Sequence, residues 1–259
     1  MTLLTTENLK KYFGETRAVD GVTLTINQGE VLSLVGPNGA GKTTLVNLIS
    51  GLIRPPDAGK ILFQDTDVTF MPPQDRIRVG IARSFQIVNL FDQLTALDNI
   101  RLAIFSRKGK TKSLLRLAEN DREVREEALE ILDQFGIEDK RNIVAGGLAQ
   151  GERKLLDVAV AYALRPTLLL LDEPTSGVST RDKGKIMDTI SGVVRSGQIT
   201  AAIVEHDMDV VFTYSDRIVV MHQGKVLADG TPDEIRTNEE VTITLLGTSK
   251  ADWSEYRTH

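Results

Sequence analysis

The sequence predicts an α/β fold, in which a mixed α/β core is interrupted by an inserted helical lobe. Short continuous apolar runs at 31–35 (VLSLV), 168–172 (LLLLD) and 199–204 (ITAAIV) are typical of strands buried on both faces of a parallel sheet. Between the first two runs, apolar residues recur at helical spacing over 124–135, with charged residues in the gaps. The core is therefore expected to begin in the first third of the chain and to resume in the last third.

Shorter patterns predict further elements of the first third. Val22, Leu24 and Ile26 alternate with polar residues, as in a strand that has one solvated face. KILFQ at 60–64 predicts another short strand, and RPPDAG at 54–59 predicts a turn between elements.

The last third shows its own start and turn signals. Ser179 and Asp182 have the spacing of a capping box, which predicts the start of a helix over 180–195. RIVVMHQGKVLADG predicts a hairpin with its turn at 222–224. Thr231 then offers an N-cap, followed by a proline at the first helical position.

Composition excludes several classes of protein. The 259 residues include no cysteine, which excludes disulfides, thiolate catalysis and cysteine-based metal sites. The net charge of −5 argues against a broad nucleic-acid surface. The start lacks the pattern of a signal peptide, and no apolar run approaches the roughly 20 residues of a membrane helix. We expect a cytoplasmic protein that reaches a membrane only through partner subunits.

The segment GPNGAGKTT at 36–44 predicts a phosphate-binding loop. It directly follows the strand at 31–35 and leads into an apolar helical pattern. Glycines allow several backbone N–H groups to converge on phosphate oxygens, and the helix N-terminus adds partial positive charge. Lys42 can reach the β- and γ-phosphates, and the Thr43 hydroxyl can ligate Mg²⁺. The predicted nucleotide-binding residues of the loop are Gly36, Pro37, Asn38, Gly39, Ala40, Gly41, Lys42, Thr43 and Thr44.

An acid pair ends the buried strand at 168–172. Asp172 stands at the carboxyl end of that strand, where ligands bind in open α/β sheets, and can hold Mg²⁺. Glu173 can polarise an attacking water as general base. The alternative is that both acids only cap the following turn. Together with the phosphate loop, the pair predicts a Mg-nucleotide hydrolase or transferase.

Four further motifs follow in a characteristic order. They are Gln86 in RSFQ, LAQGE at 148–152, SGVS at 176–179, and His206 in VEHDM. With the loop and the acid pair, they make the sequence resemble the ATP-binding-cassette (ABC) family along essentially its whole length. The resemblance implies a P-loop NTPase core of the RecA type, with an N-terminal antiparallel β subdomain and an inserted α-helical subdomain.

The resemblance also implies roles for individual residues. Gln86 would touch Mg²⁺ or the attacking water and sense a membrane subunit. His206 would hold the γ-phosphate and orient Glu173, and Phe13 would stack on adenine, with Tyr12 as its substitute. Each of these residues, taken alone, has an ordinary structural explanation, and only their joint order favours the functional one.

The segment at 148–152 corresponds to the family's signature loop, which closes the ATP held by a second cassette paired head to tail. Its residues depart from the usual Leu-Ser-Gly-Gly-Gln, because Ala149 has no hydroxyl to offer the γ-phosphate. Ser179 likewise replaces a usual aspartate, a change that bears on communication between the two ATP sites. The signature residues are Leu148, Ala149, Gln150, Gly151 and Glu152. The loop is left with Gly151, backbone N–H groups and the helix N-terminus.

Within the family, the similarity is closest to ATP-binding subunits of branched-chain amino-acid importers. It rests on GIARSFQIVNLF at 80–91, LAQGE, VEHDM and GTPDEI at 230–235. The resemblance implies membrane permease subunits, a second ATPase subunit and an extracytoplasmic solute-binding protein as partners, with ATP and Mg²⁺ as ligands and no nucleic acid. The alternatives are a cassette for lipopolysaccharide-type export, a soluble cassette in translation or DNA repair, and a weakly hydrolysing regulatory subunit.

The expected organisation is a single ABC ATPase domain over 1–259. Its nucleotide-binding core comprises 1–89 and 161–240, its helical subdomain 90–160, and its C-terminal tail 241–259. A basic run precedes the helix at 124–135 and is expected to form a solvated loop, with membrane or partner docking as the alternative. The run consists of Arg107, Lys108, Lys110, Lys112 and Arg116.

Overall fold

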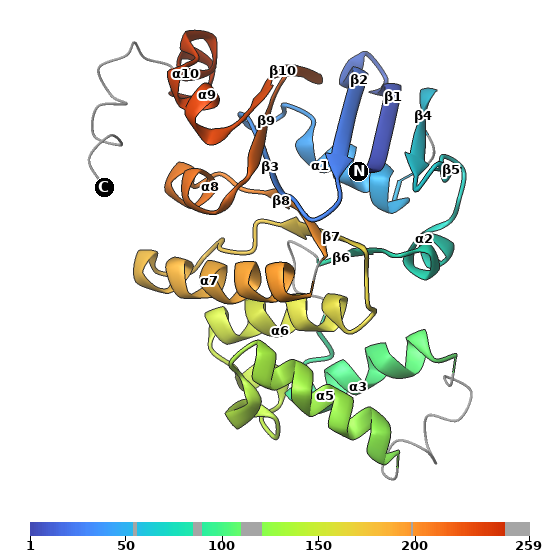
Figure 1. The fold of residues 1–259 in the computed structure, drawn as a ribbon, viewed down its shortest axis with the longest axis vertical. Coiled ribbons are helices and arrows are strands. Elements are labelled where there is room, and N and C mark those ends of the chain that lie inside the picture. Colours follow the sequence, from blue (N-terminus) through green and yellow to red (C-terminus); the bar gives the residue numbers. More distant parts are fainter. Residues whose placement is uncertain (54–55, 85–89, 110–120, 198, 247–259) are drawn as a thin grey trace. The chain divides into compact units, whose positions relative to one another are not determined.

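The computed structural model describes residues 1–53, 56–84, 90–109, 121–197 and 199–246 (Figure 1). Contacts divide the chain into two compact units. The first comprises Met1–Arg76 and Thr200–His259, and the second comprises Ile77–Ile199. The expected limits of a nucleotide-binding core and a helical subdomain stay a prediction.

An antiparallel sheet occupies the first part of the first unit. Its strand order is β2-β1-β4-β5. In β2 the apolar residues of the predicted alternation are buried, because they face the core while their neighbours are more exposed. The predicted strand at 60–64 lies largely within β4, and the turn before it falls partly outside the described residues. The bounds are β1 (Thr2–Phe13), β2 (Thr16–Asn27), β4 (Ala58–Phe63) and β5 (Thr66–Asp67).

A second group of paired strands in the same unit contains two of the three predicted buried strands. In it, β3 (Val31–Val35) runs parallel to both β8 (Thr200–Val204) and β9 (Arg217–His222). Every residue of β3 and β8 is buried, as the continuous apolar runs predicted. β10 (Lys225–Gly230) pairs antiparallel with β9, which confirms the predicted hairpin.

Helix α1 (Lys42–Ser50) follows β3, and its C-terminal end is held by a buried arginine. The last carbonyl groups of a helix have no partner within it. Arg76, in α2 (Pro73–Val79), donates to the carbonyls of Leu48 and Ile49, and also to Thr69 O at 3.0 Å. Burial lowers the pKa of Arg76 to about 10, so the guanidinium remains protonated at neutral pH. The side chain therefore fixes the helix that carries the phosphate loop.

Three short helices follow in the last described stretch of the first unit, over 200–246. They pack around β3 and β9 through a cluster that includes Val35, Val211, Ile235 and Val241. Thr231 caps the second of them, as predicted, and forms a capping box with Glu234. The helices are α8 (Met208–Tyr214), α9 (Pro232–Thr237) and α10 (Glu239–Leu246).

Among its described residues, the second unit combines two parallel strands with four longer helices. β6 (Ile81–Arg83) pairs in parallel with β7 (Leu168–Asp172), whose five residues are all buried. The predicted helix over 124–135 is confirmed as α5, and Ser179 caps α7 as its spacing predicted. The helices are α3 (Ala96–Arg107), α5 (Arg122–Gln134), α6 (Gln150–Tyr162) and α7 (Thr180–Ser196), with 3-10 turns at Glu138–Lys140 and Ala145–Gly147.

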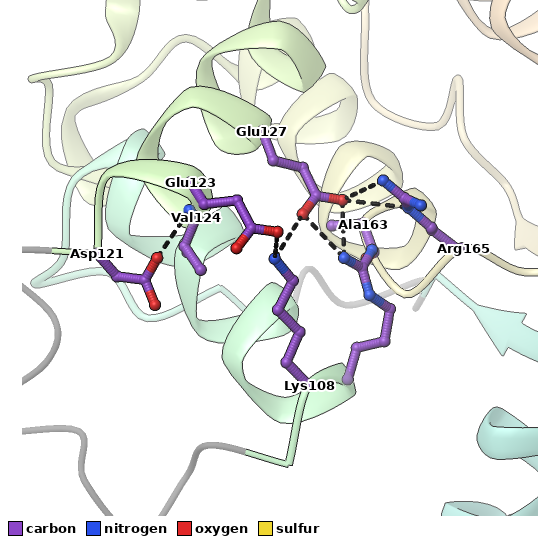
Figure 2. A network of polar contacts seen from close by, with 8 residues as sticks. Lys108, Asp121, Glu123, Val124, Glu127, Ala163 and Arg165 are labelled. Atoms are coloured by element: carbon purple, nitrogen blue, oxygen red, sulfur yellow. Dashed lines mark hydrogen bonds and ion pairs between the residues drawn. The ribbon is translucent and has the colours of Figure 1, made fainter.

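Part of the basic run is paired inside this helical unit (Figure 2). Arg107 forms two hydrogen bonds with the carboxylate of Glu127, at 2.7 and 2.9 Å, and Lys108 contacts Glu123 at 2.7 Å. Burial alone would raise the pKa of Glu127, but Arg107 and Arg165 outweigh it and lower that pKa. Arg107 and Lys108 thus tie α3 to α5, and the expectation of a solvated loop is wrong for them. Lys110, Lys112 and Arg116 lie outside the described residues.

Among the residues that the structure describes, every helix is too short or too polar to span a bilayer.

Candidate functional site

The predicted phosphate loop connects the end of β3 to the start of α1. Lys42 turns back over the loop, and its Nζ donates to the carbonyls of Gly36 at 2.7 Å and Pro37 at 3.1 Å. The N-cap of α1 is Gly41, so no side chain caps the first turn. The backbone N–H groups of that turn, together with the Lys42 ammonium, provide the donors that a polyphosphate needs.

Two glycines allow the loop to lie directly against neighbouring backbone. Gly41 has a φ of 100°, and a Cβ there would overlap the carbonyl oxygen of Ala18 in β2. A Cβ on Gly36 would overlap the carbonyl oxygen of Met221 in β9. The N–H of Gly224, in the β9–β10 turn, also donates to Ala40 O at 3.0 Å. The loop is therefore held by backbone on both sides, which fixes its shape before any ligand binds.

His206 lies at the same edge of the sheet as the phosphate loop. β8 is the parallel neighbour of β3, with Leu34 opposite Val204, so both strands end at one edge. His206 comes just after β8, with Glu205 between them, and is exposed; its backbone N–H donates to Glu205 Oε2 at 2.8 Å. The topology thus brings together two of the predicted site elements within the first unit.

Phe13 is the better candidate for stacking on a nucleotide base. It ends β1 with 52% of its surface exposed, and Lys11 Nζ lies 5.9 Å from the ring centroid. Tyr12 is engaged elsewhere, because its hydroxyl donates to Asp20 at 2.8 Å and its N–H to Asp57 at 2.7 Å. An exposed ring of this size is suited to a planar ligand.

In the second unit, Asp172 is buried beside an arginine that sequence reasoning missed. Asp172 Oδ2 accepts from Arg83 at 2.6 Å, with 1% and 7% of the two side chains exposed. A buried carboxylate needs such a partner because desolvation of an unpaired charge costs several kcal/mol. The one available signal was position: Arg83 ends the strand beside β7.

Glu173 follows with an unusual backbone conformation. Its φ of 50° lies in the left-handed region, which is strained for a residue with a side chain. Its carbonyl accepts from Ser176 N at 3.1 Å and from Lys154 Nζ at 3.0 Å. Lys154 belongs to α6 and was not singled out in the sequence, because only the fold brings it to the acid pair.

The signature loop begins α6 without a side-chain cap. Leu148 is buried as an anchor, and Ala149 occupies the N-cap, where it has no side-chain acceptor. Glu152 provides half of a capping box, since its Oε2 accepts the N–H of Ala149 at 2.9 Å. The side chain of Gln150 lies against Gly177 in the segment after the acid pair. Gln86, the remaining predicted site residue, lies outside the described residues.

In the second unit, Asp172 suits a magnesium ion that is shared with a substrate. Asp172 Oδ1 is buried and has no hydrogen-bond partner among the described residues. Thr43 belongs to the first unit, where it lies exposed in the first turn of α1. Within the described part of the chain, no group of three or more acidic or histidine side chains forms a dedicated cage. Mg²⁺ typically takes one or two carboxylates and completes its shell with water and substrate phosphates, so this sparse set suits it.

The strand–loop–helix arrangement with its lysine defines the first unit as a P-loop nucleotide-binding fold. A family profile described as "ABC transporter" matches residues 19–176. The high-affinity branched-chain amino acid transport ATP-binding protein LivG of Escherichia coli (strain K12) is 36% identical over 253 residues, covering 95% of this chain and 98% of the relative. The chain belongs to the ABC transporter family, as an ATP-binding subunit that hydrolyses ATP.

Solved structures agree with this assignment. The ADP conformation of an ATP-binding cassette of an ABC transporter superposes with a TM-score of 0.84 at 31% identity, covering 96% of this chain and all of that one. A dimeric cassette in a post-hydrolysis state with ADP and phosphate gives a TM-score of 0.75 at 28% identity, covering 89% and 99%. These likenesses confirm the predicted fold, with its antiparallel β sheet and P-loop core.

The packing around the loop predicts different costs for two alanine substitutions. Gly39 and Gly41 both have positive φ, but an added Cβ meets nothing within 4 Å at Gly39 and overlaps Ala18 O at Gly41. We expect Gly39→Ala to lower the free energy of unfolding by about 1–2 kcal/mol, the cost of backbone strain. Gly41→Ala should lower it by about 2–4 kcal/mol, because the backbone must also move. Urea unfolding without nucleotide measures the free energy of unfolding of both variants. Equal losses in the two variants would contradict the close approach of Gly41 to the carbonyl of Ala18.

Proposed function

We propose that this chain powers the import of branched-chain amino acids, or of a similar small solute, through separate membrane subunits. The observation that carries the proposal is the 36% identity, over nearly the whole of both chains, to a relative named for high-affinity branched-chain amino acid transport. The partners would be permease subunits, a second cassette and an extracytoplasmic solute-binding protein. The chain would then sit at the cytoplasmic face of the membrane, held there by the permease.

We propose further that the working ATP site is shared between two cassettes. Solved relatives include a dimeric cassette. In a head-to-tail pair, the signature loop of one subunit would face the ATP on the phosphate loop of the other. The uncapped N-termini of α1 and α6 would both direct backbone N–H groups at the triphosphate.

Each predicted site residue then has a distinct role in hydrolysis. Lys42 neutralises charge on the β- and γ-phosphates, and Phe13 stacks on the adenine. Glu173 takes the proton of the attacking water, while His206 holds the γ-phosphate in line with it. Mg²⁺, when bound, neutralises charge that develops on the phosphates, and Thr43, Asp172 and Gln86 are its proposed ligands. Positioning and charge neutralisation supply most of the rate enhancement.

A second candidate, a weakly hydrolysing regulatory subunit, is favoured by one observation. Ala149 at the N-cap of α6 offers no hydroxyl to the phosphate of a partner. A hydrogen bond to a charged group is worth about 1.5–3 kcal/mol. Retention of Glu173 and His206 supports active hydrolysis instead.

Glu173→Gln should stabilise an ATP-bound dimer. Glutamine keeps the shape of the side chain but cannot take a proton, so ATP is bound and persists. Size-exclusion chromatography with MgATP should show a shift from the 28.5 kDa monomer to about twice that mass. As the control, Glu173→Gln combined with Lys42→Ala should stay monomeric, because the loop loses its fixed charge and ATP no longer binds. Rapid hydrolysis by the Glu173→Gln variant would rule Glu173 out as the base.

Ala149→Ser should raise turnover if the missing hydroxyl limits it. The new hydroxyl would donate to the γ-phosphate of the partner's ATP, and we expect kcat to rise by about tenfold or more. Ala149→Gly, which changes the residue without adding a hydroxyl, is the matched control. An unchanged kcat in the serine variant would mean that backbone donors already suffice.

Reconstitution tests the proposed solute. The chain is co-purified with its native membrane subunits and placed in liposomes together with the solute-binding protein. Leucine, isoleucine or valine should stimulate ATP hydrolysis several-fold, since loaded binding protein favours the closed cassette dimer. The same complex with Lys42→Ala should show no stimulation. Stimulation by an unrelated solute, or stimulation that needs no binding protein, would contradict the proposal.

A further inference from the structure

Lys154 is a buried lysine whose partners lie in the segment that carries the acid pair. Only 6% of its surface is exposed, which is rare for lysine. Its Nζ donates to the carbonyl of Glu173 at 3.0 Å and to Ser176 Oγ at 2.9 Å. A buried ammonium is costly unless it is well hydrogen-bonded, so these contacts fix its position.

The carbonyl that Lys154 holds belongs to the strained residue. Glu173 has a φ of 50°, and such a conformation persists only where the surroundings impose it. Two donors impose it here, namely Lys154 Nζ and the N–H of Ser176. Because the backbone conformation at Glu173 sets the direction in which its side chain leaves the chain, the ammonium acts on the placement of the carboxylate.

The same helix carries the signature loop. α6 begins at Gln150, and Lys154 lies about one turn farther along the helix. A helix is stiff over this distance, so a displacement of the loop also displaces the ammonium. One short rigid segment therefore connects the signature residues to the backbone of Glu173 in the same chain.

We propose that Lys154 is a positioning residue for ATP hydrolysis, which orients Glu173 and ties it to the signature helix of its own subunit. The proposal rests on the proposed role of Glu173 as the base. Contact of the signature loop with the ATP of one site would then set the geometry of the base at the other site. Lys154 itself touches neither the nucleotide nor the water.

A double-mutant cycle between Lys154 and Glu173 tests this role. Lys154→Met keeps the length of the side chain and removes its donors. We expect kcat to fall about 10- to 100-fold with KM for ATP within twofold, because misplacement of the base affects the chemical step. In the Glu173→Gln background, single-turnover hydrolysis should show little further loss, since the base is already absent. Lys185→Met, on an exposed side chain of α7, is the matched control and should keep wild-type kcat.

The ATP-dependent dimer separates this role from others. Lys154→Met combined with Glu173→Gln should still dimerise with MgATP, as the single variant does. Loss of the dimer would overturn the proposal, because Lys154 would then act on ATP binding by the signature loop. The proposal would also be overturned if Lys154→Met lowered the rate by the same factor in the wild-type and in the Glu173→Gln background. High activity of Glu173→Gln alone would instead refute the proposed base, whatever Lys154 does.

Ser176→Ala provides a milder variant in case Lys154→Met does not fold. It removes one acceptor of the ammonium and leaves the charge in place. We expect a two- to fivefold lower kcat with an unchanged KM, and an unchanged kcat would overturn the proposal.

Discussion

The site depends on one constraint: a polyphosphate must be bound by backbone N–H groups that are not already hydrogen-bonded to a capping side chain. α3, α5, α7, α8 and α9 each begin with a side chain that accepts from the first turn. The N-caps of α1 and α6 are Gly41 and Ala149, which offer no such acceptor. A capping side chain normally contributes about 1 kcal/mol. Its absence in the two helices assigned to ATP leaves their N–H groups for the ligand, at some cost in stability.

Buried basic side chains provide the rigidity that this arrangement requires. Arg76 holds the end of α1, Arg83 holds Asp172, and Lys154 holds the carbonyl of Glu173. Ion pairs and buried charges add little net stability, because desolvation offsets their attraction. They do favour one geometry, since a displaced partner leaves a charge unsatisfied. We infer that these residues hold the loops in one geometry and contribute less to the stability of the fold.

The sequence predicted what is contiguous in the chain and missed what only the fold brings together. The buried strands, the N-caps at Ser179 and Thr231, and the phosphate loop have local patterns, and the structure confirms them. Arg83 and Lys154 have no such pattern, because their partners lie 89 and 19 residues away in sequence. The error over Arg107 and Lys108 has the same origin: Glu127 and Glu123 neutralise them across a helix pair.

The altered signature has a consequence that the missing hydroxyl alone does not reveal. Glu152 Oε2 accepts a hydrogen bond from the N–H of Ala149, and Glu152 Oε1 lies 3.4 Å from Lys140 Nζ. One of the backbone donors at the start of α6 is therefore already used, and those of Gln150 and Gly151 remain. Glu152 also brings a negative charge to the loop, which Lys140 partly offsets. In the proposed composite site, the γ-phosphate of a partner would be held by fewer donors than the family's usual loop supplies. Closure of the dimer must then depend more on the phosphate loop of the subunit that binds the ATP.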